Sequence, residues 1–206
     1  IKMGIDQASL AHLMDVMTNL YSDQIAAVIR EYSTNARDSH IDAGFTERPI
    51  EVSLPTQHNL RFSVQDFGLG LSVDDLSTVF SLYGASTKRE SDTVNGMLGL
   101  GCKSGLTYAL CFDVTAVKNG VKTFAQITKD EQGIGTIRVL DTASTTDANG
   151  VTISIPVKER DVRSFRDQAR EFYSYWATGT VGGDAQAHPP HKEGEEQEGR
   201  HGVDGG

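Results

Sequence analysis

The sequence lacks the features that mark secreted, membrane-spanning and nucleic-acid-coating proteins. It has only two cysteines, Cys102 and Cys111, without metal or redox spacing, so no disulfide framework is implied and a reducing cytoplasm fits. There is no signal peptide and no run of about 18 apolar residues, the length that a membrane-spanning helix needs. Positive charge is scarce: 19 Lys and Arg against 28 Asp and Glu give a formal net charge of −9, which argues against a generic nucleic-acid-coating surface.

The familiar phosphate-binding motifs are also absent. No G-x-x-x-x-G-K-[ST] occurs, and no expected strand runs into G-x-G-x-x-G, so a nucleotide site requires another architecture. The length of 206 residues allows one well-buried domain, and the hydrophobic content of 38% is ordinary for a soluble globular protein. The start at Ile1 instead of Met indicates a processed chain or an excerpt of a longer one.

Hydrophobic periodicity predicts both helices and strands, and the two do not alternate regularly along the chain. We expect helices over residues 9–20, 22–43, from Ser72, 101–110 and 161–176, with Gly44 ending the second. Strands are expected over residues 50–54, 60–64, 112–117, 122–128, 136–140 and 151–157, with a hairpin at Asn119-Gly120. This order predicts an α+β fold, a two-layer α/β sandwich in which helices cover one face of a mostly antiparallel sheet.

The last part of the chain differs in composition. Residues 179–206 contain eight glycines, no aromatic residue and the acidic cluster Glu193–Glu198, so we expect a domain over 1–178 and a disordered tail after it. The histidines of this tail are interpreted as incidental and not as metal ligands.

Glu31, Asn35 and Asp38 lie four and three residues apart, which places them on one face of the second expected helix. An Asn oxygen can complete the coordination of Mg²⁺. A Glu one turn earlier can orient and deprotonate a water for attack on a terminal phosphate. The alternative is a solvated helix face or a surface network with Arg37.

Asp66 follows an expected strand and precedes Phe67-Gly68-Leu69-Gly70. A carboxylate at this point can accept a hydrogen bond from the exocyclic amine of adenine, and the glycines let backbone approach the ring without a Cβ in the way. The alternative is an ordinary Asp-x-Gly turn.

A glycine-rich stretch precedes the fourth expected helix. Free N–H groups at the start of that helix predict an anion site, to which Lys103 adds charge unless it points into solvent. The polar residues before it are a candidate lid that folds over phosphates, and the alternative is a flexible glycine loop. The residues of this stretch are Gly96, Gly99, Gly101, Lys103 and Ser104. Taken in order, the three stretches favour a single ATP site.

These motifs resemble those of the GHKL superfamily, which includes gyrase, the ninety-kilodalton heat-shock chaperones, histidine kinases and MutL. The resemblance implies a Bergerat fold that binds ATP with Mg²⁺. It implies that Glu31 is the general base, Asn35 the metal ligand and Asp66 the adenine reader. It also places Thr152, after Asn149-Gly150, near the adenine.

Longer strings resemble the phage rIIA-like proteins, which carry a GHKL domain at the N-terminus, over residues 8–176. They are IREYSTNARDSH, FSVQDFGLGLS, YGASTKRE, LGLGCKSGLTYA and NGVTISIPVKERD. This resemblance implies a phage–host process, the host cytoplasm as location, and membrane association as a further property. An unidentified protein partner, such as a host protein, and an ATP-dependent homodimer would fit it.

Three functions stay open. The first is a slow ATPase whose nucleotide state moves a lid from Tyr83 to Gly101 and so controls a partner interaction. Glu31 favours this first function, because a pure binder does not need a base. The second is a non-hydrolysing nucleotide-dependent binding module, which is favoured because ATPase members of the superfamily usually need a Lys or Arg from a following domain and no such domain is recognised in this sequence. The third is a histidine-kinase catalytic domain, which is disfavoured because His12 is followed by Leu13 and not by an acidic residue.

Overall fold

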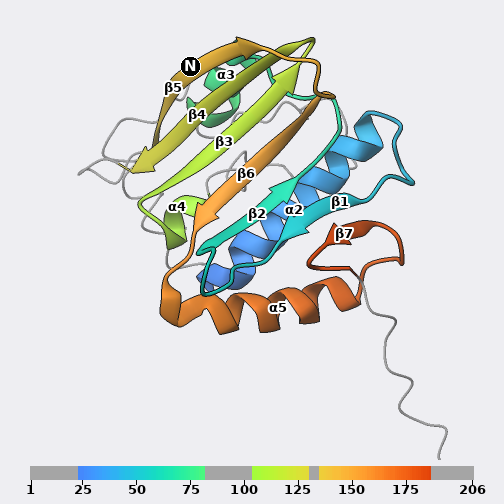
Figure 1. The fold of residues 1–206 in the computed structure, drawn as a ribbon, viewed down its shortest axis with the longest axis vertical. Coiled ribbons are helices and arrows are strands. Elements are labelled where there is room, and N and C mark those ends of the chain that lie inside the picture. The colour runs from blue at the N-terminus through green and yellow to red at the C-terminus, as the bar shows by residue number, and fades with distance from the viewer. Residues whose placement is uncertain (1–22, 82–103, 130–134, 187–206) are drawn as a thin grey trace, which may run out of the picture.

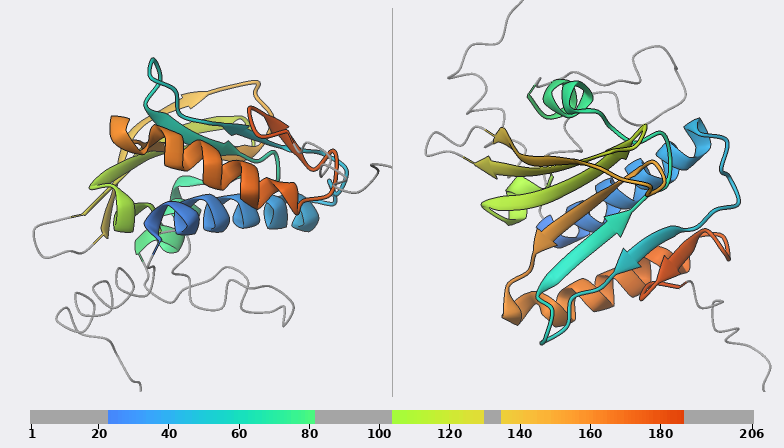
Figure 2. Two further views of the ribbon diagram at one scale, coloured as in Figure 1. Left: turned by 90° about the horizontal axis from the view of Figure 1, so that it is seen from below. Right: turned by 45° about the horizontal axis from the view of Figure 1, so that its top comes forward.

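A seven-stranded sheet forms one layer of the molecule, and helices cover one of its faces (Figures 1 and 2). The structure is a computed structural model that describes residues 23–81, 104–129 and 135–186. The strands are β1 (Ile50–Ser53), β2 (Arg61–Gln65), β3 (Cys111–Lys118), β4 (Val121–Lys129), β5 (Gly135–Ser144), β6 (Gly150–Pro156) and β7 (Val181–Gly183). Their spatial order is β5-β4-β3-β6-β2-β1-β7, and only the β1–β7 pair is parallel. The predicted α+β sandwich with a mostly antiparallel sheet is confirmed.

Apart from the early end of α4, the described helices form where the periodicity predicts them. They are α2 (Gln24–Asp42), α3 (Val73–Ser81), α4 (Gly105–Tyr108), the 3₁₀ turn η2 (Glu159–Asp161) and α5 (Val162–Ser174). The Asp23 carboxylate caps α2 by accepting from the N–H groups of Ile25 and Ala26, both at 3.0 Å. Gly44, at φ 77°, follows the helix as expected. The expected helix 9–20 lies outside the described residues.

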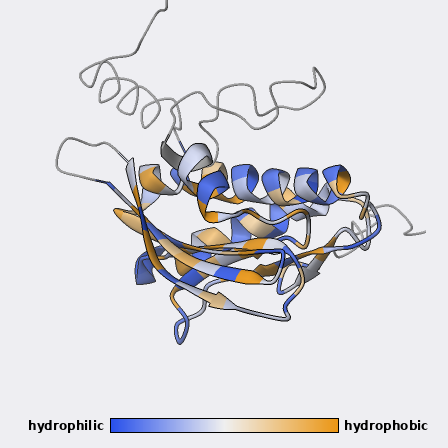
Figure 3. Cartoon of the chain, turned by 90° about the horizontal axis from the view of Figure 1, so that it is seen from above, coloured by the Kyte–Doolittle hydropathy of each residue, from blue (hydrophilic) through white to orange (hydrophobic). Residues whose placement is uncertain are grey.

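The core lies between α2, α5 and the inner face of the sheet. Val28, Ile29 and Tyr32 of α2 are buried there, as are alternate residues of the strands such as Phe62 and Val64. The opposite face of the sheet carries polar side chains: Arg61 pairs with Asp113 and donates to Ser154 Oγ at 2.7 Å. Hydrophilic residues are prominent on α2, on the side that does not face the sheet (Figure 3).

Strand β7 corrects the expected domain boundary. Residues Val181–Gly183 pair in parallel with Ile50–Val52, and Val181 and Ala185 are buried. Disorder from residue 179 was therefore the wrong expectation for this segment, while 187–206 lie outside the described residues. The three-residue strand has no periodic pattern to reveal it, because its order comes from pairing with a distant strand.

Helix α4 is shorter than the predicted helix 101–110. It ends at Tyr108, and Ala109 already has the extended ψ of 153°. Leu110 O then accepts from Lys129 N at 2.9 Å, so the chain enters the sheet at that point. Sheet pairing overrides the helical propensity of Ala109 and Leu110.

Among the residues described, no helix has both the length and the apolar character needed to cross a membrane.

Candidate nucleotide-binding site

The turn after β2 holds a buried carboxylate in a fixed orientation. Asp66 is 6% exposed, and its Oδ1 accepts from Ser39 Oγ at 3.1 Å and from Gly68 N at 2.9 Å. Both hydrogen bonds end on Oδ1, so Oδ2 is the oxygen best placed to accept from an amine donor. The turn is also tied to the sheet, because Asp66 N donates to Val151 O at 2.9 Å.

Burial raises the pKa of the Asp66 carboxyl above its ordinary value of 3.8. Hydrogen bonds from the Gly68 backbone and the Ser39 hydroxyl, with a smaller effect of the Val151 backbone, oppose this rise without cancelling it. A buried carboxylate of this kind is stabilised more by a further hydrogen-bond donor than an exposed carboxylate is.

Glycines let the turn pass close to three neighbouring backbones. A Cβ on Gly68 would lie 2.1 Å from Ser39 Oγ, and one on Gly70 would lie 1.8 Å from Val117 O. A Cβ on Gly150, at the start of β6, would lie 2.1 Å from Asp66 O. Gly68 and Gly70 were expected to make room for a ring. In the structure both also permit close packing of the turn against α2 and β3.

The polar residues of α2 border this turn. Glu31 is 22% exposed at its side chain, Asp38 is partly exposed and Asn35 is exposed. Ser39 lies four residues after Asn35 and eight after Glu31, so the helix face that carries these residues ends at the contact of Ser39 with Asp66. The Oε1 atom of Glu31 accepts from Arg30 Nε at 3.3 Å and from the terminal Arg30 nitrogen at 3.1 Å.

Asn35 is the residue of this face that fits a Mg²⁺ ligand. Its amide is exposed on the helix one turn from Glu31, and Mg²⁺ takes few protein ligands when phosphates and waters supply the rest. Within the described part of the chain, no group of three or more His, Cys, Asp or Glu side chains could hold a metal by itself. A single exposed amide oxygen fits a metal that arrives with its phosphates.

The start of α4 lies against the same helix. Gly105 N donates to Tyr32 Oη at 2.9 Å, so this particular N–H is not free for an anion. A four-residue helix also supplies little dipole. Ser104 is fully buried and its Oγ has no hydrogen-bond partner among the described residues, which fits a polar ligand atom beside it. Gly96, Gly99, Gly101 and Lys103 lie outside the described residues.

Thr152 is not brought to the site. In the β2–β6 pair Thr152 is opposite Gln65, whereas Ile153 is opposite the buried Val64. Since side chains alternate between faces, Thr152 points to the open face of the sheet, away from Asp66. The residue of β6 that contacts Asp66 is its neighbour Val151, through the backbone.

Ser39, His40 and Gly150 contact the turn but were not predicted. Ser39 and His40 directly follow Asp38, and Gly150 lies two residues before Thr152, so all three stand near predicted residues. Their adjacency to those motifs was the only signal, because each acts through a contact that depends on the fold.

The sheet, the helix face with Glu31 and Asn35, and the Asp66 turn together have the arrangement of a GHKL-type nucleotide-binding domain. A family model described as histidine kinase-, DNA gyrase B-, and HSP90-like ATPase matches residues 21–146, more than half of the chain. The chain belongs to this family and is an ATP-binding domain of the GHKL type. No curated protein matches the sequence.

Proposed function

We propose that this domain binds ATP together with Mg²⁺ and hydrolyses it slowly to ADP and phosphate. The observation that carries the proposal is the buried Asp66 carboxylate, fixed through Oδ1 by Ser39 and Gly68 beside the helix face of Glu31 and Asn35. A carboxylate held in this way suits recognition of the adenine amine, and the helix face suits the phosphate end.

Each residue has a distinct role in this proposal. Asp66 accepts a hydrogen bond from the exocyclic amine, and Glu31 orients the attacking water and accepts its proton. Asn35 is the protein ligand of Mg²⁺, which supplies charge neutralisation at the phosphates when bound. Asp38, on the same helix face, is proposed to line the nucleotide site. Ser104, with Gly96, Gly99, Gly101 and Lys103, is proposed to contact the phosphates.

A non-hydrolysing binding module is the second candidate. It is favoured by the position of Arg30, whose guanidinium donates to Glu31 Oε1, one of the two oxygens that could accept a proton from water. A domain that uses ATP only as a ligand does not need a base at this point.

Binding and phosphate release measured on the same variants separate the two candidates. Slow hydrolysis requires that Glu31→Ala bind ATP with nearly unchanged affinity and lose about a hundredfold or more in turnover, the lower end of the range for a general base. Asp66→Asn should weaken ATP binding by about tenfold or more, since it alters a charged hydrogen-bond acceptor. The matched controls are Glu171→Ala on α5 and Asp141→Asn on β5, both exposed residues away from the site.

Wild-type protein that binds ATP with Mg²⁺ but releases no phosphate establishes the binding module instead. Unchanged ATP affinity in Asp66→Asn contradicts the assignment of the pocket itself.

We further propose, from the quoted strings alone, that the chain is related to the phage rIIA-like proteins and acts with a protein partner in the host cytoplasm. Control of that partner by a lid from Tyr83 to Gly101 and an ATP-dependent homodimer are parts of the same proposal. The lid residues 83–101 lie outside the described residues.

A further inference from the structure

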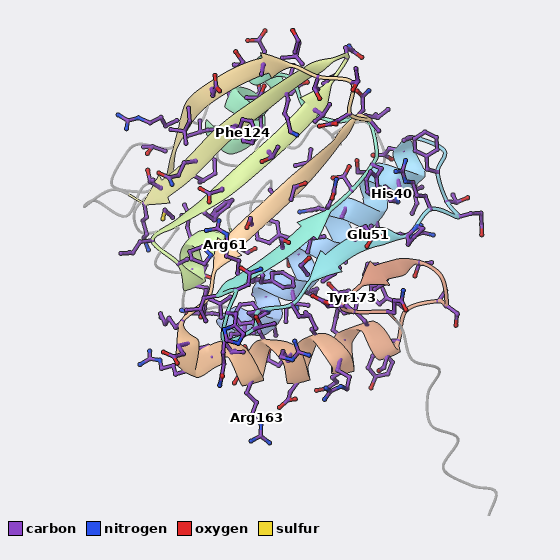
Figure 4. The ribbon with its side chains drawn as sticks, in the orientation of Figure 1. His40, Glu51, Arg61, Phe124, Arg163 and Tyr173 are labelled. Atoms are coloured by element: carbon purple, nitrogen blue, oxygen red, sulfur yellow. The ribbon has the colours of Figure 1, made fainter. Side chains whose placement is uncertain are left out.

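His40 is a buried histidine whose two ring nitrogens are both engaged. It lies in the last turn of α2 and is fully buried (Figure 4). Its Nδ1 is 2.9 Å from Arg48 O, and its Nε2 is 2.7 Å from Phe67 N. A carbonyl can only accept and a backbone N–H can only donate, so Nδ1 carries the hydrogen and Nε2 is bare. The ring is therefore neutral and held in one tautomer.

Through these two contacts His40 joins three segments of the chain. It belongs to α2, donates to the loop before β1 and accepts from the turn after β2. The Arg48 guanidinium lies 3.7 Å from the centroid of the Phe67 ring and covers it. The His40 ring is 6.1 Å from the same ring. The Asp66–Phe67 peptide is thus held through its N–H, and the Phe67 ring beside it is held by Arg48 and His40.

Two consecutive residues of α2 hold Asp66 from different directions. Ser39 donates to the carboxylate, whereas His40 accepts from the N–H of the Asp66–Phe67 peptide. Loss of the His40 acceptor would leave a buried N–H unsatisfied and allow this peptide to rotate towards another partner. Rotation of the peptide moves the Asp66 side chain, because both belong to the same short turn.

We propose that His40 is a positioning residue that sets adenine specificity, by holding the Asp66–Phe67 peptide so that Asp66 Oδ2 meets the exocyclic amine. This rests on the proposed role of Asp66. A neutral imidazole suits the position because it donates and accepts at once in a rigid frame. Leucine has a similar size but does neither, whereas glutamine can do both with a more flexible side chain.

The test compares the affinities for ATP and inosine triphosphate, in which a carbonyl replaces the exocyclic amine. Wild-type protein should bind ATP at least about tenfold more tightly, as expected for a hydrogen bond to a charged acceptor. His40→Leu should lose most of this preference through weaker ATP binding, while its inosine triphosphate affinity stays within about threefold of wild type. His40→Gln should restore much of the preference, since it can replace both hydrogen bonds.

Tyr173→Phe on α5 is the matched control, because its hydroxyl contacts the same helix α2. It removes the buried hydrogen bond between Tyr173 Oη and Ser33 Oγ, 2.6 Å long, which lies between α2 and α5. It should lower stability and leave the ATP preference unchanged. If His40→Leu does not fold, His40→Met is measured with the same expectation, because methionine adapts to irregular space.

The outcomes separate failure of the inference from failure of the proposed function. A wild-type protein without preference for ATP overturns the role of Asp66 and the inference with it. A preference that persists in a folded His40→Leu or His40→Met overturns the inference alone. An equal loss of affinity for both nucleotides also overturns it, because His40 would then be structural only.

Discussion

Gly70 allows the turn after β2 to pass against the end of β3 at a distance that a side chain would forbid. It has φ 67°, and an added Cβ would meet Val117 O at 1.8 Å. Gly70→Ala should therefore cost the left-handed strain of about 1–2 kcal/mol and a further 1–3 kcal/mol for the displaced backbone. The measurement is the free energy of unfolding in urea.

Gly44→Ala separates these two contributions. Gly44 has φ 77°, but an added Cβ would meet nothing within 4 Å, so this variant should show the strain alone. Equal losses of stability in the two variants would contradict the packing argument for Gly70.

The placement of single candidate residues was predictable where it follows from local spacing. Glu31 and Asn35 share a helix face because they are four apart, and Asp66 stands out in the sequence because it comes before two glycines. Thr152 was expected near the adenine, but the face of the sheet to which it points depends on its pairing with Gln65, which the sequence does not reveal. Ser39 and His40 were missed because their hydrogen bonds cross to a turn 27 residues away.

At the level of elements, one ion pair joins the start of α3 to the sheet. Lys118 Nζ at the end of β3 donates to Asp75 Oδ2 at 2.6 Å, and Ser72 N and Oγ donate to the same oxygen. The Lys118 hydrogen bond, followed by those of Ser72, lowers the pKa of Asp75 from 3.8 to about 2. The α3 helix therefore begins at a charge-dependent contact.

This contact should make stability depend on pH in acid. The folded pKa lies below the unfolded value, so the stabilisation is present above pH 3.8 and is lost as the pH falls towards about 2. Urea unfolding at pH 5 and pH 3 should show a steeper loss in the wild type than in Asp75→Asn, by about 0.5 kcal/mol for a partly exposed pair.

Asp74→Asn is the control, since Asp74 stands beside Asp75 in the same first turn. It removes the same charge without touching Lys118. If Asp74→Asn flattens the pH dependence as much as Asp75→Asn does, the effect is general charge repulsion and not the ion pair.

Helices and strands were predictable from periodicity where the local sequence alone determines them. Helix α2 and strands β1–β4 and β6 lie close to their expected bounds, and Asn119-Gly120 forms the expected hairpin, with φ of 52° and 78°. Strand β7 and the early end of α4 were not predictable, because each is fixed by pairing with a distant strand.

At the scale of the molecule, β7 completes the edge of the sheet beside β1. Asp184 adds two hydrogen bonds to the same edge, from its N–H to Val52 O at 2.8 Å and from Leu54 N to its Oδ2 at 3.0 Å. A chain ending at residue 178 loses these contacts and the burial of Val181, whose side chain alone is worth about 1.5–3 kcal/mol.

Two truncations test this contribution. The chain 1–186 should keep the stability of the full chain, whereas 1–178 should be less stable by about 2–4 kcal/mol in urea unfolding. Equal stability of the two truncated chains would show that the domain ends before β7.

The central position of β6 has a consequence for how the protein is made on the ribosome. This strand joins β3 to β2 and lies beyond the residues matched by the family model, so the sheet consists of two unconnected halves until residues 150–156 are synthesised. Its Val151 also accepts from Asp66 N. Until then the nascent domain lacks the strand that holds the Asp66 turn, so binding of ATP at the proposed site is expected only once synthesis of this domain is nearly complete.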